Sequence, residues 1–141
     1  MMSFFLTEEM CEELAGAAKK KSRELGVDVT MSISDENGNL KLLQKFGNAI
    51  LPSIEISQNK AYTAAVLRQP TAEFGQIAQV GASAFGINMT NSRLIIFGGG
   101  FPLKVGEKTV GGIGISGGSV EEDEAIASAA LKAFEGILTR E

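Results

Sequence analysis

The sequence predicts an α+β fold, with a five-stranded antiparallel sheet packed against helices. The order of the expected elements carries this prediction: a helix, two strands, further helices, three strands and a last helix, rather than alternating strand and helix units. With 141 residues the chain has the length of one domain with a single core, so residues 1–141 are expected to form one domain. The lone cysteine and the absence of histidine exclude an internal disulfide and the usual zinc spacings.

The first helix is expected to begin after Thr7, a favoured capping residue, and to end at Gly26. Apolar and polar residues then alternate from 27 to 34, the pattern of a half-buried strand. Residues 35–38, Asp-Glu-Asn-Gly, contain the Asn-Gly pair of a tight hairpin, and residues 40–46 form the return strand.

The middle of the chain is predicted to be helical. Ser53 is expected to cap a second helix that runs to about Leu67 and ends before Pro70. Residues 71–80 predict a short third helix, whereas residues 81–91 show no clear periodicity.

Three further strands and a helix complete the expected fold. The uninterrupted apolar run 94–97 indicates a strand covered on both faces, and residues 101–105 and 109–116 form a hairpin. Ser119 and Glu122 are spaced as a capping box at the start of the last helix, whose first turn carries four acids.

Composition argues against several classes of partner. A net charge of -4 and a pI near 5.0 provide no basic surface for nucleic acid, and the run Lys19 to Lys21 is too short to supply one.

The opening ten residues lack the basic flank and long apolar stretch of a signal peptide or membrane span, so a cytoplasmic location is expected. No nucleophile, base and orienting group occur at a recognisable spacing, so the chain is not expected to be an enzyme.

The segment 98–118 is unusually rich in glycine, with nine glycines in 21 residues. Residues 112–117 match the dinucleotide pattern GxGxxG, but that pattern also needs a second parallel strand and an acid about 20 residues on, and the sequence stops with the predicted helix. The dinucleotide interpretation therefore fails on topology. Backbone N–H groups of residues 117–119 remain as potential anion donors, although the acids at 121–124 oppose an anion there.

One face of the last strand carries almost no side chains. Ile113 and Ile115 point to one face, whereas Gly112, Gly114 and Ser116 leave the other bare. That bare face admits a planar ligand, a closely crossing helix or a neighbouring subunit.

A few side chains of the sequence have ligand-binding chemistry. Lys60 lies among small residues, where its amine either pairs with a ligand carboxylate or extends past Ala61 into solvent. Tyr62 is either a donor or ferric-iron ligand, or a packing residue. The sulfur-containing residues offer soft metal ligands or, more simply, hydrophobic packing; they are Met10, Cys11, Met31 and Met89.

Three segments together resemble a known family. They are KAYTAA at 60–65, GGGFPL at 98–103 and VGGIGISGGSVEEDEAIA at 110–127. They resemble the GlcG/HbpS family of haem-binding and haem-degrading proteins, which is related to the C-terminal domain of PduO-type cobalamin adenosyltransferases. The resemblance implies a profilin-like fold, five antiparallel strands with helices on both faces, and a homo-oligomer.

The resemblance also implies a tetrapyrrole ligand, haem or a corrinoid, in connection with glycolate or with diol and glycerol utilisation. Family members that bind haem commonly use a histidine from the first helix as the iron ligand, and this sequence contains no histidine. Haem would therefore bind without a histidine ligand, and a corrinoid or another flat carboxylated ligand needs none.

The sequence thus predicts a small cytoplasmic, non-enzymatic binding or accessory protein that forms homo-oligomers. The predicted ligand-binding residues are Lys60, Gly99, Gly100, Pro102, Gly112, Gly114, Ser116 and Gly117. The alternative is a structural homo-oligomer without a small-molecule ligand, in which the glycines serve subunit packing.

Overall fold

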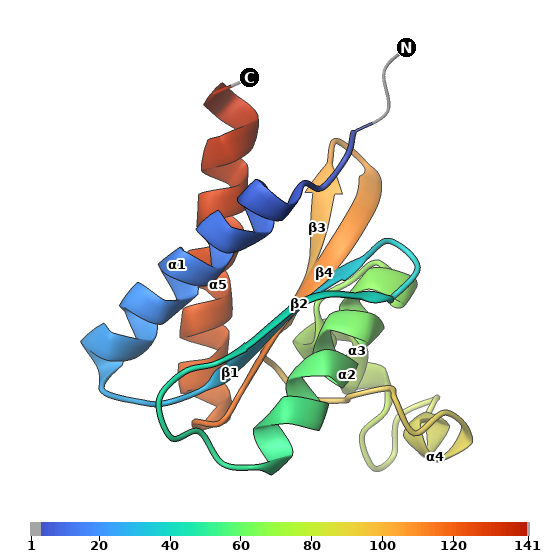
Figure 1. The fold of residues 1–141 in the computed structure, drawn as a ribbon. Coiled ribbons are helices and arrows are strands. Elements are labelled where there is room, and N and C mark those ends of the chain that lie inside the picture. Colours follow the sequence, from blue (N-terminus) through green and yellow to red (C-terminus); the bar gives the residue numbers. More distant parts are fainter. Residues whose placement is uncertain (1–3, 141) are drawn as a thin grey trace.

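A four-stranded antiparallel sheet lies between two layers of helices in the computed structural model, which describes residues 4–140 (Figure 1). The strand order is β2-β1-β4-β3. Helices α1 and α5 lie side by side on one face of the sheet, and α2 covers the other. The elements are α1 (Glu8–Leu25), β1 (Thr30–Asp35), β2 (Leu40–Lys45), α2 (Pro52–Leu67), α3 (Thr71–Ile77), α4 (Ile87–Thr90), β3 (Gly100–Val105), β4 (Lys108–Ser116) and α5 (Val120–Arg140). The first three residues of the opening segment lie outside the described residues, as does residue 141.

The predicted start and end of α1 are confirmed, and so is the predicted start of α5. Thr7 Oγ1 accepts the Met10 N–H at 3.1 Å, and Gly26 ends α1 in the left-handed region with φ of 68°. At the start of α5, the Ser119 N–H donates to Glu122 Oε1 and the Glu122 N–H donates to Ser119 Oγ. This reciprocal pair is the expected capping box.

The predicted cap of α2 is wrong. The helix begins at Pro52, and no side chain caps it. The Ser53 hydroxyl instead lies 2.8 Å from Thr30 Oγ1 on β1, so it joins the helix to the sheet. Proline at the first helical position lacks an N–H group that would need a cap.

The prediction of five strands is also wrong, because residues 94–97 do not form a strand within the described part of the chain. Their backbone contacts the helices on the α2 face of the sheet. The Ile95 N–H donates to Thr63 Oγ1 on α2 at 3.0 Å, and the Ile96 carbonyl lies against Gly75 on α3. The apolar run therefore packs under helices as irregular backbone, and β3 remains the edge of the sheet.

β1 is buried on both faces rather than half-buried as its alternation predicted. Met31 and Ile33 enter the core with α1 and α5. The hydroxyl residues on the opposite face are covered by α2: Ser32 Oγ lies 2.8 Å from Ser57 Oγ, and the Ser34 hydroxyl donates to the Ala61 carbonyl at 3.3 Å. Polar residues are buried here because each hydroxyl has a partner on the helix.

The bare face of β4 is filled by α2 of the same chain. A Cβ atom built on Gly114 would lie 2.6 Å from the Ala61 nitrogen and closer still to the Ser57 carbonyl oxygen. At Gly112 the Ala61 carbonyl oxygen occupies the same position. Of the three occupants that the sequence left open, the closely crossing helix is therefore the one that lies against these glycines.

This packing predicts a large loss of stability for Gly114→Val. We expect the free energy of unfolding to fall by about 3 kcal/mol or more, since no rearrangement of the α2 backbone makes room for a branched side chain. Urea denaturation followed by circular dichroism measures the change. Gly16→Ala is the control, because Gly16 lies in α1 with nothing near its Cβ position. That change should raise stability by about 0.5–1 kcal/mol. A Gly114→Val protein as stable as the native one would contradict the close packing.

Candidate functional site

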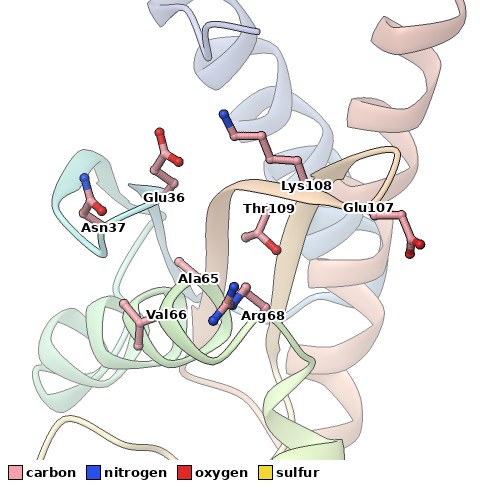
Figure 2. A pocket seen from close by; sticks show the side chains of 8 residues that line it. All are labelled: Glu36, Asn37, Ala65, Val66, Arg68, Glu107, Lys108 and Thr109. Atoms are coloured by element: carbon pink, nitrogen blue, oxygen red, sulfur yellow. The ribbon is translucent and has the colours of Figure 1, made fainter. Parts of the chain in front are cut away.

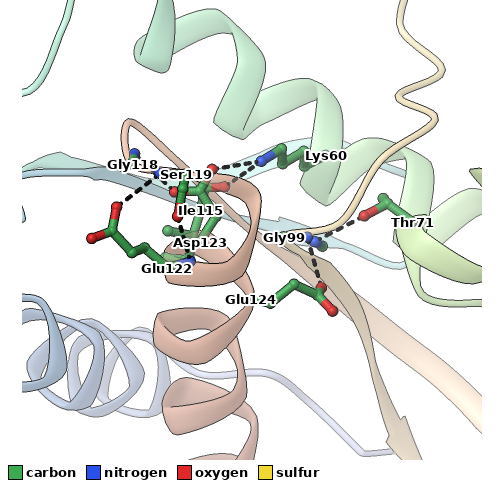
Figure 3. A network of polar contacts seen from close by, with 10 residues as sticks. Lys60, Thr71, Gly99, Ile115, Gly118, Ser119, Glu122, Asp123 and Glu124 are labelled. Carbon is green, nitrogen blue, oxygen red and sulfur yellow. Dashed lines mark hydrogen bonds and ion pairs between the residues drawn. The ribbon is translucent and has the colours of Figure 1, made fainter. Parts of the chain in front are cut away.

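A buried ion pair lies at the centre of the predicted site (Figure 3). Lys60 of α2 is fully buried, and its Nζ lies 3.0 Å from Asp123 Oδ2 and donates to the Ile115 carbonyl oxygen at 2.8 Å. The ring of Phe97 lies 5.2 Å from the amine. Lys60 therefore does not extend into solvent, and its positive charge is already balanced within the chain.

The first turn of α5 binds the glycine segment through its carboxylates (Figure 3). Asp123 Oδ1 accepts the Gly118 N–H at 3.0 Å, and Glu124 Oε2 accepts the Gly99 N–H at 2.8 Å. The Gly100 N–H donates to Thr71 Oγ1 at 3.0 Å. The predicted anion near residues 117–119 thus has a counterpart in the structure: the anions bound by Gly118 and Ser119 are the chain's own carboxylates.

Burial dominates the electrostatics of the pair. It lowers the pKa of the Lys60 amine and raises the pKa of the Asp123 carboxyl, and the attraction between the two groups opposes both changes. Because each shift favours the neutral form, each charge is tolerated in the interior only while the other is present.

Most of the eight predicted binding residues are in the interior. A Cβ on Gly99 would lie 2.5 Å from Lys60 Nζ, so this glycine closes over the ion pair. Two glycines, Gly99 and Gly117, have positive φ angles of 119° and 139°. Gly117 is the exception, because it is only half-buried. Pro102 is buried and also lines an apolar groove of about 260 Å³ with Phe101 and Phe134. The buried members of the set are Lys60, Gly99, Gly100, Pro102, Gly112, Gly114 and Ser116.

Tyr62 lies nearer the surface, on the side of α2 next to the loop before β3. The guanidinium carbon of Arg93 lies 3.9 Å from the centre of the Tyr62 ring, and the Asn91 amide donates to the Tyr62 hydroxyl at 3.3 Å. This cation over an aromatic ring is a surface feature that the sequence analysis did not identify.

The sulfur-containing residues divide between core and surface. Cys11 and Met31 are buried in the core, and burial raises the pKa of the Cys11 thiol. Met10 packs against the same core, whereas Met89 is 84% exposed.

Within residues 4–140, no group of three or more Cys, Asp or Glu side chains is placed to hold a metal ion. No helix in this part of the chain is long and apolar enough to cross a membrane.

Sequence reasoning missed the partners of Lys60 and of the glycines. Asp123 and Glu124 were assigned to a charged first turn, and Thr71 only to a helix start, yet all three bind the segment 98–118. The available signal was the position of four acids directly after the glycines, where backbone N–H groups are free to donate.

The antiparallel sheet between two helical layers places this chain in a class of small α+β domains that have solved structures. One of these is the PduOC:haem complex, which has a TM-score of 0.89 and 34% identity over 92% of this chain and 95% of its own. Residues 6–132 match the family described as Haem degrading protein HbpS-like, and the chain belongs to this HbpS-like family. The resemblance inferred from the sequence motifs is thereby confirmed.

Two relatives with similar sequences extend this comparison. The uncharacterised 15.0 kDa protein in the dhaT-dhaS intergenic region of Citrobacter freundii is 42% identical over 130 residues, 92% of each chain. Corrinoid adenosyltransferase PduO of Salmonella typhimurium is 36% identical over 123 residues, which are 86% of this chain but 37% of PduO. The chain therefore corresponds to only part of that enzyme.

The ion pair predicts a pH-dependent defect for Lys60→Met. Removing the amine leaves Asp123 without its counter-charge, and we expect a loss of about 3–5 kcal/mol in the free energy of unfolding at neutral pH. The folded-state pKa of Asp123 then lies further above its unfolded value, so folding favours the protonated acid. The deficit should consequently shrink as the pH falls from neutrality towards the unfolded-state pKa of about 4.

Urea denaturation of the native and variant proteins across this pH range measures the deficit. Lys132→Met on the exposed face of α5 is the matched control, expected to change stability by no more than about 0.5 kcal/mol. A Lys60→Met deficit that does not vary with pH would show that the lost amine acted through packing alone.

Proposed function

We propose that this chain is a cytoplasmic, homo-oligomeric accessory protein that binds a tetrapyrrole, haem or a corrinoid, without being an enzyme. Membership of the HbpS-like family and the haem complex of a similar domain support the ligand class. The similarity to PduO and to a protein encoded between dhaT and dhaS supports a connection with diol or glycerol utilisation.

A macrocycle does not fit against the glycine face, because the backbone of α2 already touches Gly112 and Gly114. Lys60 likewise has no free charge for a propionate, since its amine is paired with Asp123. In this proposal Lys60, Gly112 and Gly114 shape the domain that carries the ligand. A direct contact between any of them and a tetrapyrrole stays a prediction.

The observation that carries the proposal is a run of exposed apolar side chains on residues 77–97. A planar apolar ring gains free energy by covering such side chains. The five exposed residues are Ile77 (45%), Val80 (87%), Phe85 (65%), Met89 (84%) and Phe97 (43%). The same segment supplies Arg93, a cation for a carboxylate of the ligand, and Asn91, which binds the Tyr62 hydroxyl.

Tyr62 and Met89 are the side chains that would ligate haem iron if haem were bound near them. Phenolate oxygen and thioether sulfur both ligate haem iron in proteins. Cys11 and Met31 do not suit that role, because they are enclosed in the core. Bound haem would supply an iron centre at this surface, and the chain would hold it through apolar contact and Arg93.

A structural homo-oligomer without a ligand is the second candidate, and the same exposed apolar residues favour it, since subunit contacts also cover such surfaces. The glycines offer no support for this alternative where they pack against α2 of the same chain. Size-exclusion chromatography of Phe85→Ser and Met89→Ser tests it, because loss of the oligomer with unchanged haem affinity would favour the structural role.

Haemin and cobalamin titrations followed by absorbance test the tetrapyrrole proposal. We expect saturable binding of at least one of them. For haemin, Tyr62→Phe should shift the Soret band, and Arg93→Ala should weaken binding about tenfold, the loss that corresponds to one charged contact. Lys20→Ala on the exposed face of α1 should change neither value. Absence of saturable binding to both ligands would overturn the proposal.

A further inference from the structure

A second cleft lies apart from the ion pair and the exposed apolar segment (Figure 2). The turn between β1 and β2, the end of α2 and the turn between β3 and β4 enclose it, with a volume of about 480 Å³. Ala65 of α2 contributes an apolar wall, and Arg68 and Thr109 lie near one another at the centre of the view.

The floor of this cleft contains an unpartnered hydroxyl. Thr109 is 6% exposed, and its Oγ1 is the one buried side-chain oxygen or nitrogen in residues 4–140 that has no hydrogen-bond partner. Every other buried hydroxyl in this part of the chain has a partner, including those that face α2. A buried polar group without a partner is unfavourable, so its presence in a cleft indicates a partner supplied from outside the chain.

Arg68, a charged side chain that lines the same cleft, is also unengaged. It is exposed, and no hydrogen bond or ion pair joins its guanidinium to another described residue. A planar guanidinium presents parallel N–H groups that match the two oxygens of a carboxylate. Its long side chain is flexible, so it can hold an anion against the Thr109 hydroxyl.

The charges around the cleft favour a ligand with a single negative charge over a dianion. Lys108 adds a second cation to Arg68, but Glu36 and Glu107 balance the two. The C-terminal end of α2 adds a partial negative charge. A dianion such as sulfate would meet repulsion here, whereas a monoanion with a short apolar chain fits Ala65 and the guanidinium.

We propose that this cleft binds a small monocarboxylate, whose oxygens accept hydrogen bonds from the Arg68 guanidinium and the Thr109 hydroxyl. The proposal does not rest on tetrapyrrole binding. It assigns a second, separate ligand to the domain.

Two variants remove the proposed contacts while preserving the fold. Thr109→Val keeps the shape of the side chain and deletes the unpartnered hydroxyl, so the ligand-free protein should melt at the same or a higher temperature. Arg68 has a φ angle of 59°, a conformation that glycine adopts without strain, so Arg68→Gly should also fold. A loss of binding in either variant is then separable from a loss of structure.

The probes are sodium acetate and sodium propionate, titrated into isotopically labelled protein and followed by amide chemical shifts, with sodium chloride at matched ionic strength. We expect saturable shifts at residues 68, 108 and 109 with both acids. Thr109→Val should weaken binding about fivefold to tenfold, and Arg68→Gly at least tenfold, whereas Thr109→Ser should retain it. Arg23→Gln and Thr139→Val, on exposed helix positions, should bind as the native protein does.

Three results would overturn the proposal. They are amide chemical shifts that chloride reproduces, tighter binding of sulfate than of acetate, and an unchanged acetate affinity in Thr109→Val. The last result would mean that the Thr109 hydroxyl binds only water. Haemin titration of Arg68→Gly separates the two proposals: unchanged haemin affinity is expected, and a joint loss of haemin and acetate binding would mean that the carboxylate belongs to a tetrapyrrole rather than to a small acid.

Discussion

The pairing of Lys60 with Asp123 is the constraint on which the rest of the interior depends. It joins α2 to the start of α5 across the end of β4, and the Ile115 carbonyl and Gly118 N–H complete its hydrogen bonds. A buried pair of this kind adds little net stability compared with apolar residues of the same size, but removal of one member leaves an uncompensated charge. We infer that its effect is to select one arrangement of these elements over others. The close approach of the glycine segment follows from that arrangement, because Gly99 lies directly against the amine.

The glycines of the segment 98–118 have two different structural roles. Glycines in β4 admit the helix backbone, and the glycines beside α5 donate N–H groups to carboxylates of the same chain. Neither set is left open for a flat ligand within the domain. The side chains proposed to contact ligands lie instead at the periphery: Tyr62 and Arg93 lie together, and Arg68 lines a separate cleft with Thr109.

The features that the sequence predicted correctly are local. The caps at Thr7 and Ser119 bind partners three residues away, so spacing alone identifies them. The errors arise where distant elements decide the outcome. The apolar run 94–97 resembles a strand, but it contacts α2 and α3 instead of pairing with the sheet. The environment of Lys60 could not be read from its neighbours, because Asp123 lies 63 residues further along the chain. The unpartnered Thr109 hydroxyl has no sequence signature at all.

The hydroxyl and glycine contacts between α2 and the sheet also bear on the entropy of folding. Serine, alanine and glycine have few rotamers to lose, so this interface orders little side-chain freedom compared with one built from leucine or methionine. The hydroxyl pair of Ser32 and Ser57 restricts sliding of the helix along the strand, because a shift of one residue would break the hydrogen bond between them. The opposite face of the sheet, with Met31 and Ile33 against α1 and α5, supplies most of the hydrophobic free energy. The α1 and α5 face of the sheet thus provides hydrophobic stabilisation, and the other face fixes the position of α2 along the strands.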